Sequence, residues 1–286
     1  MLGTIASIID GVLIGSVYGL AAMGLTLIWG VMGVVNLTHG AAIVAGMFAL
    51  YLLTSALSVP AYAALPVILI GGFLVGVGLY WIAVHRLIGR PPLMILLSTF
   101  AVNLVVIGLG TAVWGTGLFN IPVTLPGVTW HRYTFPGTHI LAAALTAVIA
   151  GAMYVFLYHT RLGKAVRAVA NNREAAELAG IPTTRVLSLS FGLGVALAGA
   201  AGMLISTMFP FTVLAGDAYQ LKSFVVTALG GLGNPAGALV GGVALGLVEG
   251  FAAQYMPVSW TLVIEFVLFV FVLILFPRGI FAFRRT

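Results

Sequence analysis

The chain has no cysteine and very little charge. None of its 286 residues is Cys, which excludes disulfides, thiolate metal sites and cysteine nucleophiles. Asp, Glu, Lys and Arg make up only 6% of the residues, whereas a soluble domain contains about 25%. So little polar surface cannot cover a chain of this length in water. The composition therefore excludes an ordinary soluble domain.

Most of the chain is apolar. Apolar residues make up 62% of the chain and lie in runs of about 20, long enough to cross a hydrocarbon core of about 30 Å as a helix. A membrane β-barrel would show short alternating segments instead. The sequence predicts an all-α polytopic membrane bundle, a single domain over 1–286 embedded in the lipid bilayer. We expect helices at about 8–30, 36–57, 62–84, 93–113, 138–158, 187–208, 218–232, 236–255 and 260–276.

The number of crossings and their direction depend on two features. The 218–232 and 236–255 runs are short and glycine-rich, so they form either two crossings or one crossing with a re-entrant hairpin, giving eight or nine spans. Basic residues favour the cytoplasmic side. Nine spans, with the N-terminus outside and the C-terminus cytoplasmic, place ten of the twelve Lys and Arg inside. These ten lie between apolar runs, which argues against nucleic-acid binding; they are Arg86, Arg90, Arg161, Lys164, Arg167, Arg173, Arg185, Arg278, Arg284 and Arg285.

Glycines recur four residues apart in three stripes. Small residues at this spacing form a flat strip on a helix and let another backbone approach closely in lipid. Ordinary close packing is the simplest interpretation of each stripe. The stripes are Gly11, Gly15 and Gly19; Gly233, Gly237 and Gly241; and Gly242, Gly246 and Gly250.

Two segments are expected to interrupt helices. The run 228–242, "ALGGLGNPAGALVGG", combines helix-breaking residues at Gly230, Gly231, Gly233 and Pro235 with a polar Asn234. A second break is expected at 29–40, where Asn36 and His39 follow glycines. Paired interruptions in two halves of a membrane protein point weakly to a transport pathway. Asn36, His39 and Asn234 are therefore candidate pathway residues.

Few ionisable groups lie inside the apolar runs. Glu249 and Glu265 are the firm cases, with Asp217 and Lys222 at the margins. A charge at the bilayer centre costs roughly 2.5–3.5 kcal/mol, so both glutamates should face protein or water. Glu249 joins the candidate pathway, although a hydrogen-bonded packing role is the alternative for each. We predict no metal site, no bound cofactor and no catalytic set, and hence no enzyme.

The segment "RLGKAVRAVANNREAAELAGIPTTRV", 161–186, is the one strongly charged stretch. On a helix, one face carries Lys164, Arg167, Asn171 and Glu174. Leu162, Val166, Val169 and Ala176 share another face. This amphipathic pattern predicts a helix along the membrane surface or beneath the bundle, ending near Gly180 and Pro182. Binding to anionic lipid is one simple explanation of its basic face.

The same segment resembles a known signature. "EAAELAG", with Glu174, Ala175, Ala176 and then Gly180 after three residues, resembles the EAA–x3–G loop of bacterial ABC importer permeases. Further stretches resemble the branched-chain amino-acid permease family, in the same order and over about 8–281. They are "GVMGVVNLTHGA", "RAVANNREAAELAGI", "LAGAAGML", "FVVTALGGLGNPAGALVGG" and "FPRGIF".

The resemblance implies a permease subunit of the bacterial inner membrane. Its 161–185 segment, with Arg173, Glu174, Ala175, Ala176 and Gly180, would dock into a separate ABC ATPase that uses the ATP. A periplasmic binding protein would deliver the solute, and a second permease or a copy of this chain would complete the pathway. The solute would be a branched-chain amino acid or a related small polar molecule.

Two other classes are weighed against this interpretation. A secondary transporter or channel would need no ATPase but would be expected to carry more intramembrane ion-coupling groups than Glu249 and Glu265. An intramembrane enzyme would need a nucleophile–base pair or a metal set. The five histidines, at 39, 85, 131, 139 and 159, are spread over different segments and offer neither.

Overall fold

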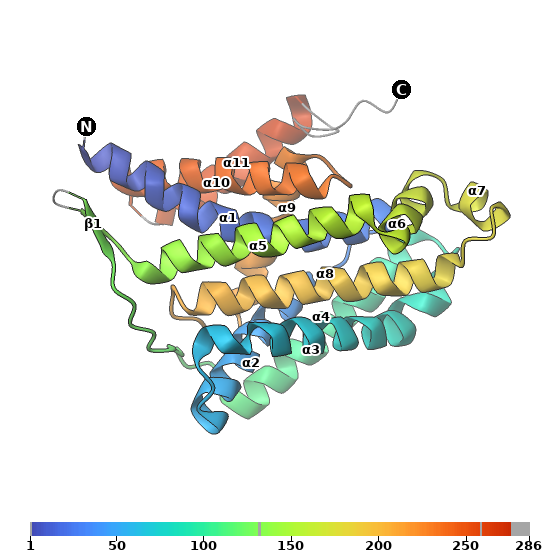
Figure 1. Cartoon of the computed structure of the whole chain (residues 1–286), viewed down its shortest axis with the longest axis horizontal. Helices are drawn as coiled ribbons and strands as arrows, with labels where there is room; N and C mark the ends of the chain where they lie inside the picture. The colour runs from blue at the N-terminus through green and yellow to red at the C-terminus, as the bar shows by residue number, and fades with distance from the viewer. Residues whose placement is uncertain (1, 131–132, 258, 276–286) are drawn as a thin grey trace.

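The computed structural model describes residues 2–130, 133–257 and 259–275, and the described chain is mostly helical (Figure 1). Its α-helices are α1 (Leu2–Met32), α2 (His39–Leu57), α3 (Leu65–Leu79), α4 (Pro92–Trp114), α5 (Gly137–His159), α6 (Arg161–Asn171), α7 (Arg173–Leu178), α8 (Thr183–Ser206), α9 (Ala215–Gly230), α10 (Pro235–Tyr255) and α11 (Ser259–Leu275). Short turns flank α3, namely the 3-10 helices Ala61–Ala64 and His85–Leu87 and the π-turn Tyr80–Val84. Strands β1 (Val128–Trp130) and β2 (Tyr133–Phe135) pair antiparallel.

The predicted membrane bundle is confirmed, with small shifts at the helix ends. Among the described residues, seven segments are long and apolar enough to cross a membrane: Gly3–Met32, His39–Leu57, Ala61–Leu87, Pro92–Trp114, Gly137–His159, Thr183–Ser206 and Pro235–Tyr255. With 16 residues, α9 is about 24 Å long, shorter than a hydrocarbon core of about 30 Å. The described part of α11 has 17 residues. The first predicted span is longer than expected, because the helix begins at Leu2.

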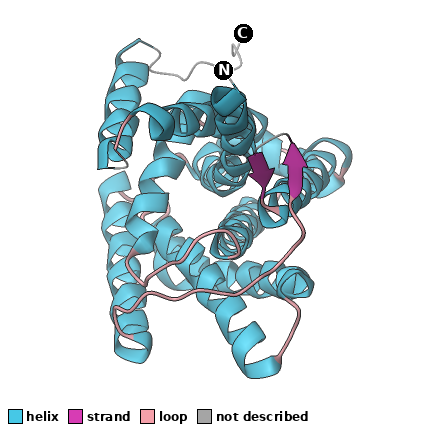
Figure 2. Ribbon diagram, turned by 90° about the vertical axis from the view of Figure 1, so that its left-hand side faces the viewer, coloured by secondary structure: helices cyan, strands magenta, loops and turns pink. Residues whose placement is uncertain are grey.

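The bundle has two chemically different ends. One end, called here the hairpin end, carries β1, β2 and the start of α1, and its loops lie across the view in Figure 2. The opposite end carries α6 and α7 together with the turn between α3 and α4 (Figure 1). We call it the basic end, because seven of the twelve Lys and Arg belong to it: Arg86, Arg90, Arg161, Lys164, Arg167, Arg173 and Arg185.

The glycine stripes of α1 and α10 pack against each other. A Cβ added at Gly246 would lie 2.1 Å from the Gly11 carbonyl oxygen, and one at Gly242 would lie 2.4 Å from the Gly19 Cα. No side chain fits at such distances, so glycine is required at this antiparallel contact. Two of the three predicted stripes, the one in α1 and the one at Gly242, Gly246 and Gly250, therefore form one interface held by close backbone packing. In the third stripe, Gly237 and Gly241 face Gly230 and Val226 of α9 instead.

Helix α8 is the most enclosed span. Nearly all of its residues are buried, and its small residues let α1, α2 and α3 approach, as at the contact of Gly194 with the Gly24 carbonyl. In contrast, α3, α4 and α5 expose apolar side chains such as Ile70, Leu104 and Val148. These outer faces are typical of helices covered by lipid.

Candidate functional site

The charged segment folds into two short helices at the basic end. Asn172 separates α6 from α7, and its Oδ1 accepts a hydrogen bond of 3.0 Å from the Ala175 N–H. Sequence periodicity favoured one continuous helix and missed this break, although Asn is a common N-cap residue. The predicted end is confirmed, because α7 stops at Leu178 and Gly180 adopts a positive φ of 79°.

The predicted apolar face of this segment is mostly buried. Val166, Val169 and Ala176 pack against the bundle, whereas Leu162, in the first turn of α6, is 53% exposed.

The EAA residues occupy the outermost element of the basic end (Figure 1). Arg173, Glu174, Ala175 and Gly180 are exposed, and Ala176 is buried. Leu178, which the sequence analysis did not single out, is 91% exposed. Leu178 is two residues from the buried Ala176 and therefore lies on the opposite side of α7 from the bundle.

Glu177 fixes α7 to the start of α8. Its carboxylate accepts hydrogen bonds from the Thr183 hydroxyl and from Arg173 Nε, the latter at 3.3 Å. The Thr183 hydrogen bond, followed by the bond and charge of Arg173, lowers the pKa of Glu177 below its ordinary value. Glu177 was not among the predicted site residues, although its spacing of four from Arg173 is typical of a helical ion pair.

The break at Asn36 and His39 starts α2 inside the bundle. Asn36 Oδ1 accepts a hydrogen bond of 3.0 Å from the Thr38 N–H, and the Gly40 N–H donates to Gln220 Oε1 of α9 at 2.9 Å. His39 is fully buried. This region therefore joins the first turns of α2 and α9, with Gln220 as a cap that the sequence did not reveal.

The predicted glycine-rich break is confirmed as the turn between α9 and α10. Helix α9 ends at Gly230, the φ angles of Gly231 and Gly233 are 90° and 81°, and α10 begins at Pro235. Asn234 Oδ1 accepts from the Gly237 N–H at 3.1 Å and caps α10.

This turn lies at the basic end, not in the middle of the bundle. Gly233 packs on Gly30 in the last turns of α1. Asn234 lines a cavity of about 180 Å³ together with Thr26, Tyr158 and Arg167. The two short runs therefore form a helical hairpin whose tip meets α6.

Three ionisable side chains meet near the middle of the bundle. Lys222 Nζ of α9 lies 2.6 Å from Glu249 Oε1 of α10 and also donates to Glu265 Oε1 of α11. The ammonium group lies 4.9 Å from the ring centroid of Tyr18, midway along α1. We call these three residues the central ion cluster. Both glutamates therefore face protein, as predicted, and share one cation.

The exposure of the cluster is uneven. The Lys222 and Glu265 side chains are 12% and 2% exposed, whereas Glu249 is 23% exposed. Glu249 and Asn234 are 15 residues apart on α10, or about 22 Å, so the pathway candidates do not form one pocket. Helix α9 connects two of the places, through Gln220 at α2 and Lys222 at the cluster.

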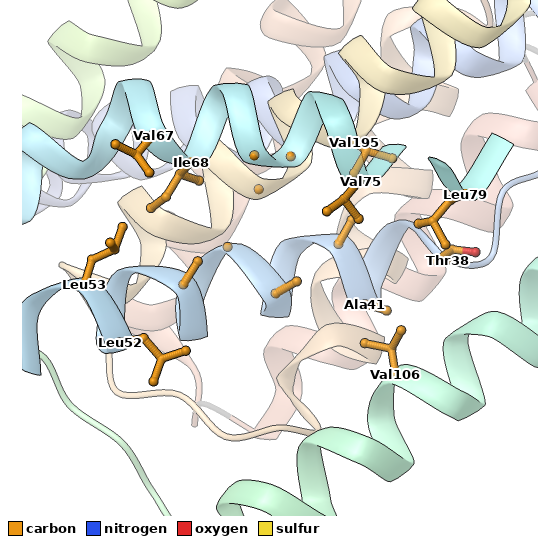
Figure 3. A pocket seen from close by; sticks show the side chains of 17 residues that line it. Thr38, Ala41, Leu52, Leu53, Val67, Ile68, Val75, Leu79, Val106 and Val195 are labelled. Atoms are coloured by element: carbon orange, nitrogen blue, oxygen red, sulfur yellow. The ribbon is translucent and has the colours of Figure 1, made fainter. Parts of the chain in front are cut away.

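An apolar groove of about 420 Å³ lies between α2, α3 and α4 (Figure 3). Its lining includes Leu52 and Ala41 of α2, Val67 and Val75 of α3, and Val106 of α4. A lining of this kind is typical of a surface that hydrocarbon covers. The groove offers no charged side chain to a polar solute.

Comparison with known proteins gives a consistent result. The family model described as branched-chain amino acid transport system / permease component matches residues 7–273. The chain is 28% identical to the high-affinity branched-chain amino acid transport system permease protein LivH of Escherichia coli K12, covering 95% of this chain and 93% of that protein. It is 27% identical to BraD of Pseudomonas aeruginosa, covering 96% and 94%. A probable branched-chain amino acid transport permease of Methanocaldococcus jannaschii is also 27% identical, covering 96% and 91%. No solved structure matches.

Proposed function

The chain belongs to the family of branched-chain amino acid transport permeases, and from this membership we propose that it works as the membrane subunit of an ABC importer. The proposed importer lies in the bacterial inner membrane, with the basic end and the C-terminus in the cytoplasm. A separate ATPase binds and hydrolyses ATP, and a periplasmic protein delivers the solute. A second permease, or a copy of this chain, completes the pathway.

The observation that carries the proposal is the position of α7. The EAA residues Glu174 and Ala175 and the side chain of Leu178 project from the basic end, while Ala176 holds α7 on the bundle. The bonds of Glu177 make α7 a firm attachment to α8, the most enclosed helix. A push by the ATPase on α7 would therefore move the helical bundle as a rigid body.

The same push has a direct route to the pathway candidates. The α9–α10 turn, with Asn234, shares a cavity with Arg167 of α6. Helix α9 then leads to Gln220 beside His39 and to Lys222 beside Glu249. We propose that the solute passes along this polar side of α9 and that Glu249, the most exposed member of the central ion cluster, faces it.

The proposed solute follows from the relatives. LivH, BraD and the M. jannaschii protein are described as branched-chain amino acid permeases, and each is similar to this chain over almost its whole length. Partial similarity, over less than half of the chain, extends to a ribose import permease of Bacillus subtilis, so a related small polar solute is the second candidate. Uptake of labelled leucine by cells that express the neighbouring transport genes separates the two.

Co-purification tests the partner. Leu178→Asp should abolish retention of the ATPase and uptake, while Leu118→Asp, at a residue 73% exposed near the hairpin end, should leave both intact. Gly180→Trp should likewise block coupling. Gly115→Trp is the matched control, because both glycines have positive φ and open space around them. Uptake that continues without any ATPase would instead support a secondary transporter or channel.

A further inference from the structure

The corner between α5 and α6 is rigidly built. Thr160 Oγ1 accepts from the Gly163 N–H at 3.0 Å and thereby caps α6. A Cβ added at Gly163 would lie 2.0 Å from the Phe156 carbonyl oxygen, so α6 folds back closely onto the end of α5. Arg167 Nε donates to the Leu157 carbonyl at 3.1 Å, which satisfies one of the free carbonyls in the last turn of α5. These contacts therefore fix α6 against the last turn of α5, a helix long enough to span the membrane.

This corner lies on the side of the bundle that faces lipid. Val148 and Val155 of α5 are 68% and 54% exposed, and Tyr154 and Tyr158 continue the same surface toward the basic end. Tyrosines at the end of a membrane helix are typical of the headgroup region. The Arg167 guanidinium lies 4.6 Å from the ring centroid of Tyr158. Its charge is therefore at the perimeter, where the hydrocarbon layer ends.

The positive charge of the corner has no counter-charge. Arg161, Lys164 and Arg167 are exposed, and residues 161–171 contain no Asp or Glu. None of the three forms an ion pair within the described part of the chain, whereas Arg173 in α7 pairs with Glu177. Three basic groups on two successive turns of one helix would attract a phosphate group.

We propose that Tyr158, Arg161, Lys164 and Arg167 form a binding site for the phosphate headgroup of an anionic lipid. The tyrosine marks the headgroup level, the guanidinium above it offers its remaining N–H groups, and the other two cations add charge. The acyl chains of the lipid then lie along the exposed apolar face of α5. The site lies on α5 and α6, inside the 161–185 segment but apart from the α7 residues proposed to contact the ATPase, and its test needs no ATPase.

Purified protein without any ATPase tests the site. Thermal stability in detergent is followed while phosphatidylglycerol or phosphatidylcholine is added, and bound lipids are counted by native mass spectrometry. Phosphatidylglycerol should raise the Tm. In Arg161→Gln/Lys164→Gln, the phosphatidylglycerol concentration that gives half of this shift should rise roughly thirtyfold, the effect of two lost charges. The matched control Arg86→Gln/Arg90→Gln also removes two exposed charges from the basic end and should bind like the wild type. The side chains of Arg161 and Lys164 take no part in the Thr160 and Arg167 hydrogen bonds that fix the corner.

Several results would overturn the proposal. Phosphatidylglycerol could act equally on wild type, on the Gln pair and on the charge reversal Arg161→Glu/Lys164→Glu. Inorganic phosphate could reproduce the full shift at the same concentration, which would indicate a site for free anions. Finally, the Gln pair could keep normal lipid binding but lose the ATPase in pull-down, which would assign the face to the partner protein. A failure of Leu178→Asp to release the ATPase would affect only the proposed function.

Discussion

Lys222→Met tests whether the central ion cluster holds three helices together. The substitution leaves two carboxylates facing each other inside the bundle, with Glu265 only 2% exposed. Removing one partner of a buried ion pair costs roughly 3–5 kcal/mol, because the other charge stays buried without compensation. The Glu265 contact should account for most of the loss, since Glu249 is more exposed. Lys164→Met, at the other lysine of the chain, should be nearly neutral.

Reversible unfolding in mixed micelles of SDS and a mild detergent gives the free energy of unfolding for each variant. A triple variant with Met at 222, 249 and 265 removes all three charges and keeps similar volumes, so it should recover most of the stability lost by Lys222→Met. Replacing a whole buried ion pair by apolar groups is often neutral. The reasoning is refuted if Lys222→Met is as stable as the wild type, or if the triple variant is no more stable than the single one.

Three further outcomes are expected. Gly246→Ala should lower the free energy of unfolding by roughly 1–3 kcal/mol, because its methyl group would overpack the contact with α1. The control Gly108→Ala, in open space, should be neutral or stabilising. Unfolding in the same micelles measures both variants. Glu249→Gln should reduce solute uptake more than Glu265→Gln, because Glu249 is the more exposed, and equal uptake rates would remove it from the pathway. A hydrogen bond from the Thr183 hydroxyl of α8 lowers the pKa of Glu177, so the Glu177 carboxylate holds α7 fully at neutral pH and loses this effect as the pH falls through the lowered pKa. Protection of α7 from protease should fall in the same pH range. A flat pH profile would contradict the assignment.

Much of the fold could be predicted because lipid leaves one strong pattern in the sequence. Apolar runs of about 20 residues give the spans, and paired glycines give the faces that pack closely. The sequence alone could not tell which stripe meets which, since Gly11 and Gly246 are 235 positions apart. The glycines and Pro235 marked the turn between α9 and α10, but they did not reveal at which end of the bundle it lies.

The site was less predictable for a related reason. Glu249 and Glu265 were recognisable as charges that need partners, but Lys222 was assigned to the margin of a span. It is, however, the only Lys or Arg inside the predicted apolar runs, and charge balance alone could have paired it with the glutamates. Gln220 and Glu177 act on neighbouring elements through single hydrogen bonds, and such contacts leave no periodic pattern in a sequence.

The contact between α1 and α10 also constrains how the protein is made. At about 5–20 residues per second, a ribosome needs roughly 10–50 s to go from Gly11 to Gly246. During that time the bare backbone strip of the first helix has no partner from its own chain. The insertion machinery or neighbouring lipids must cover it until the tenth helix arrives, so a chain truncated before α10 should leave the strip open to the membrane's quality-control proteases.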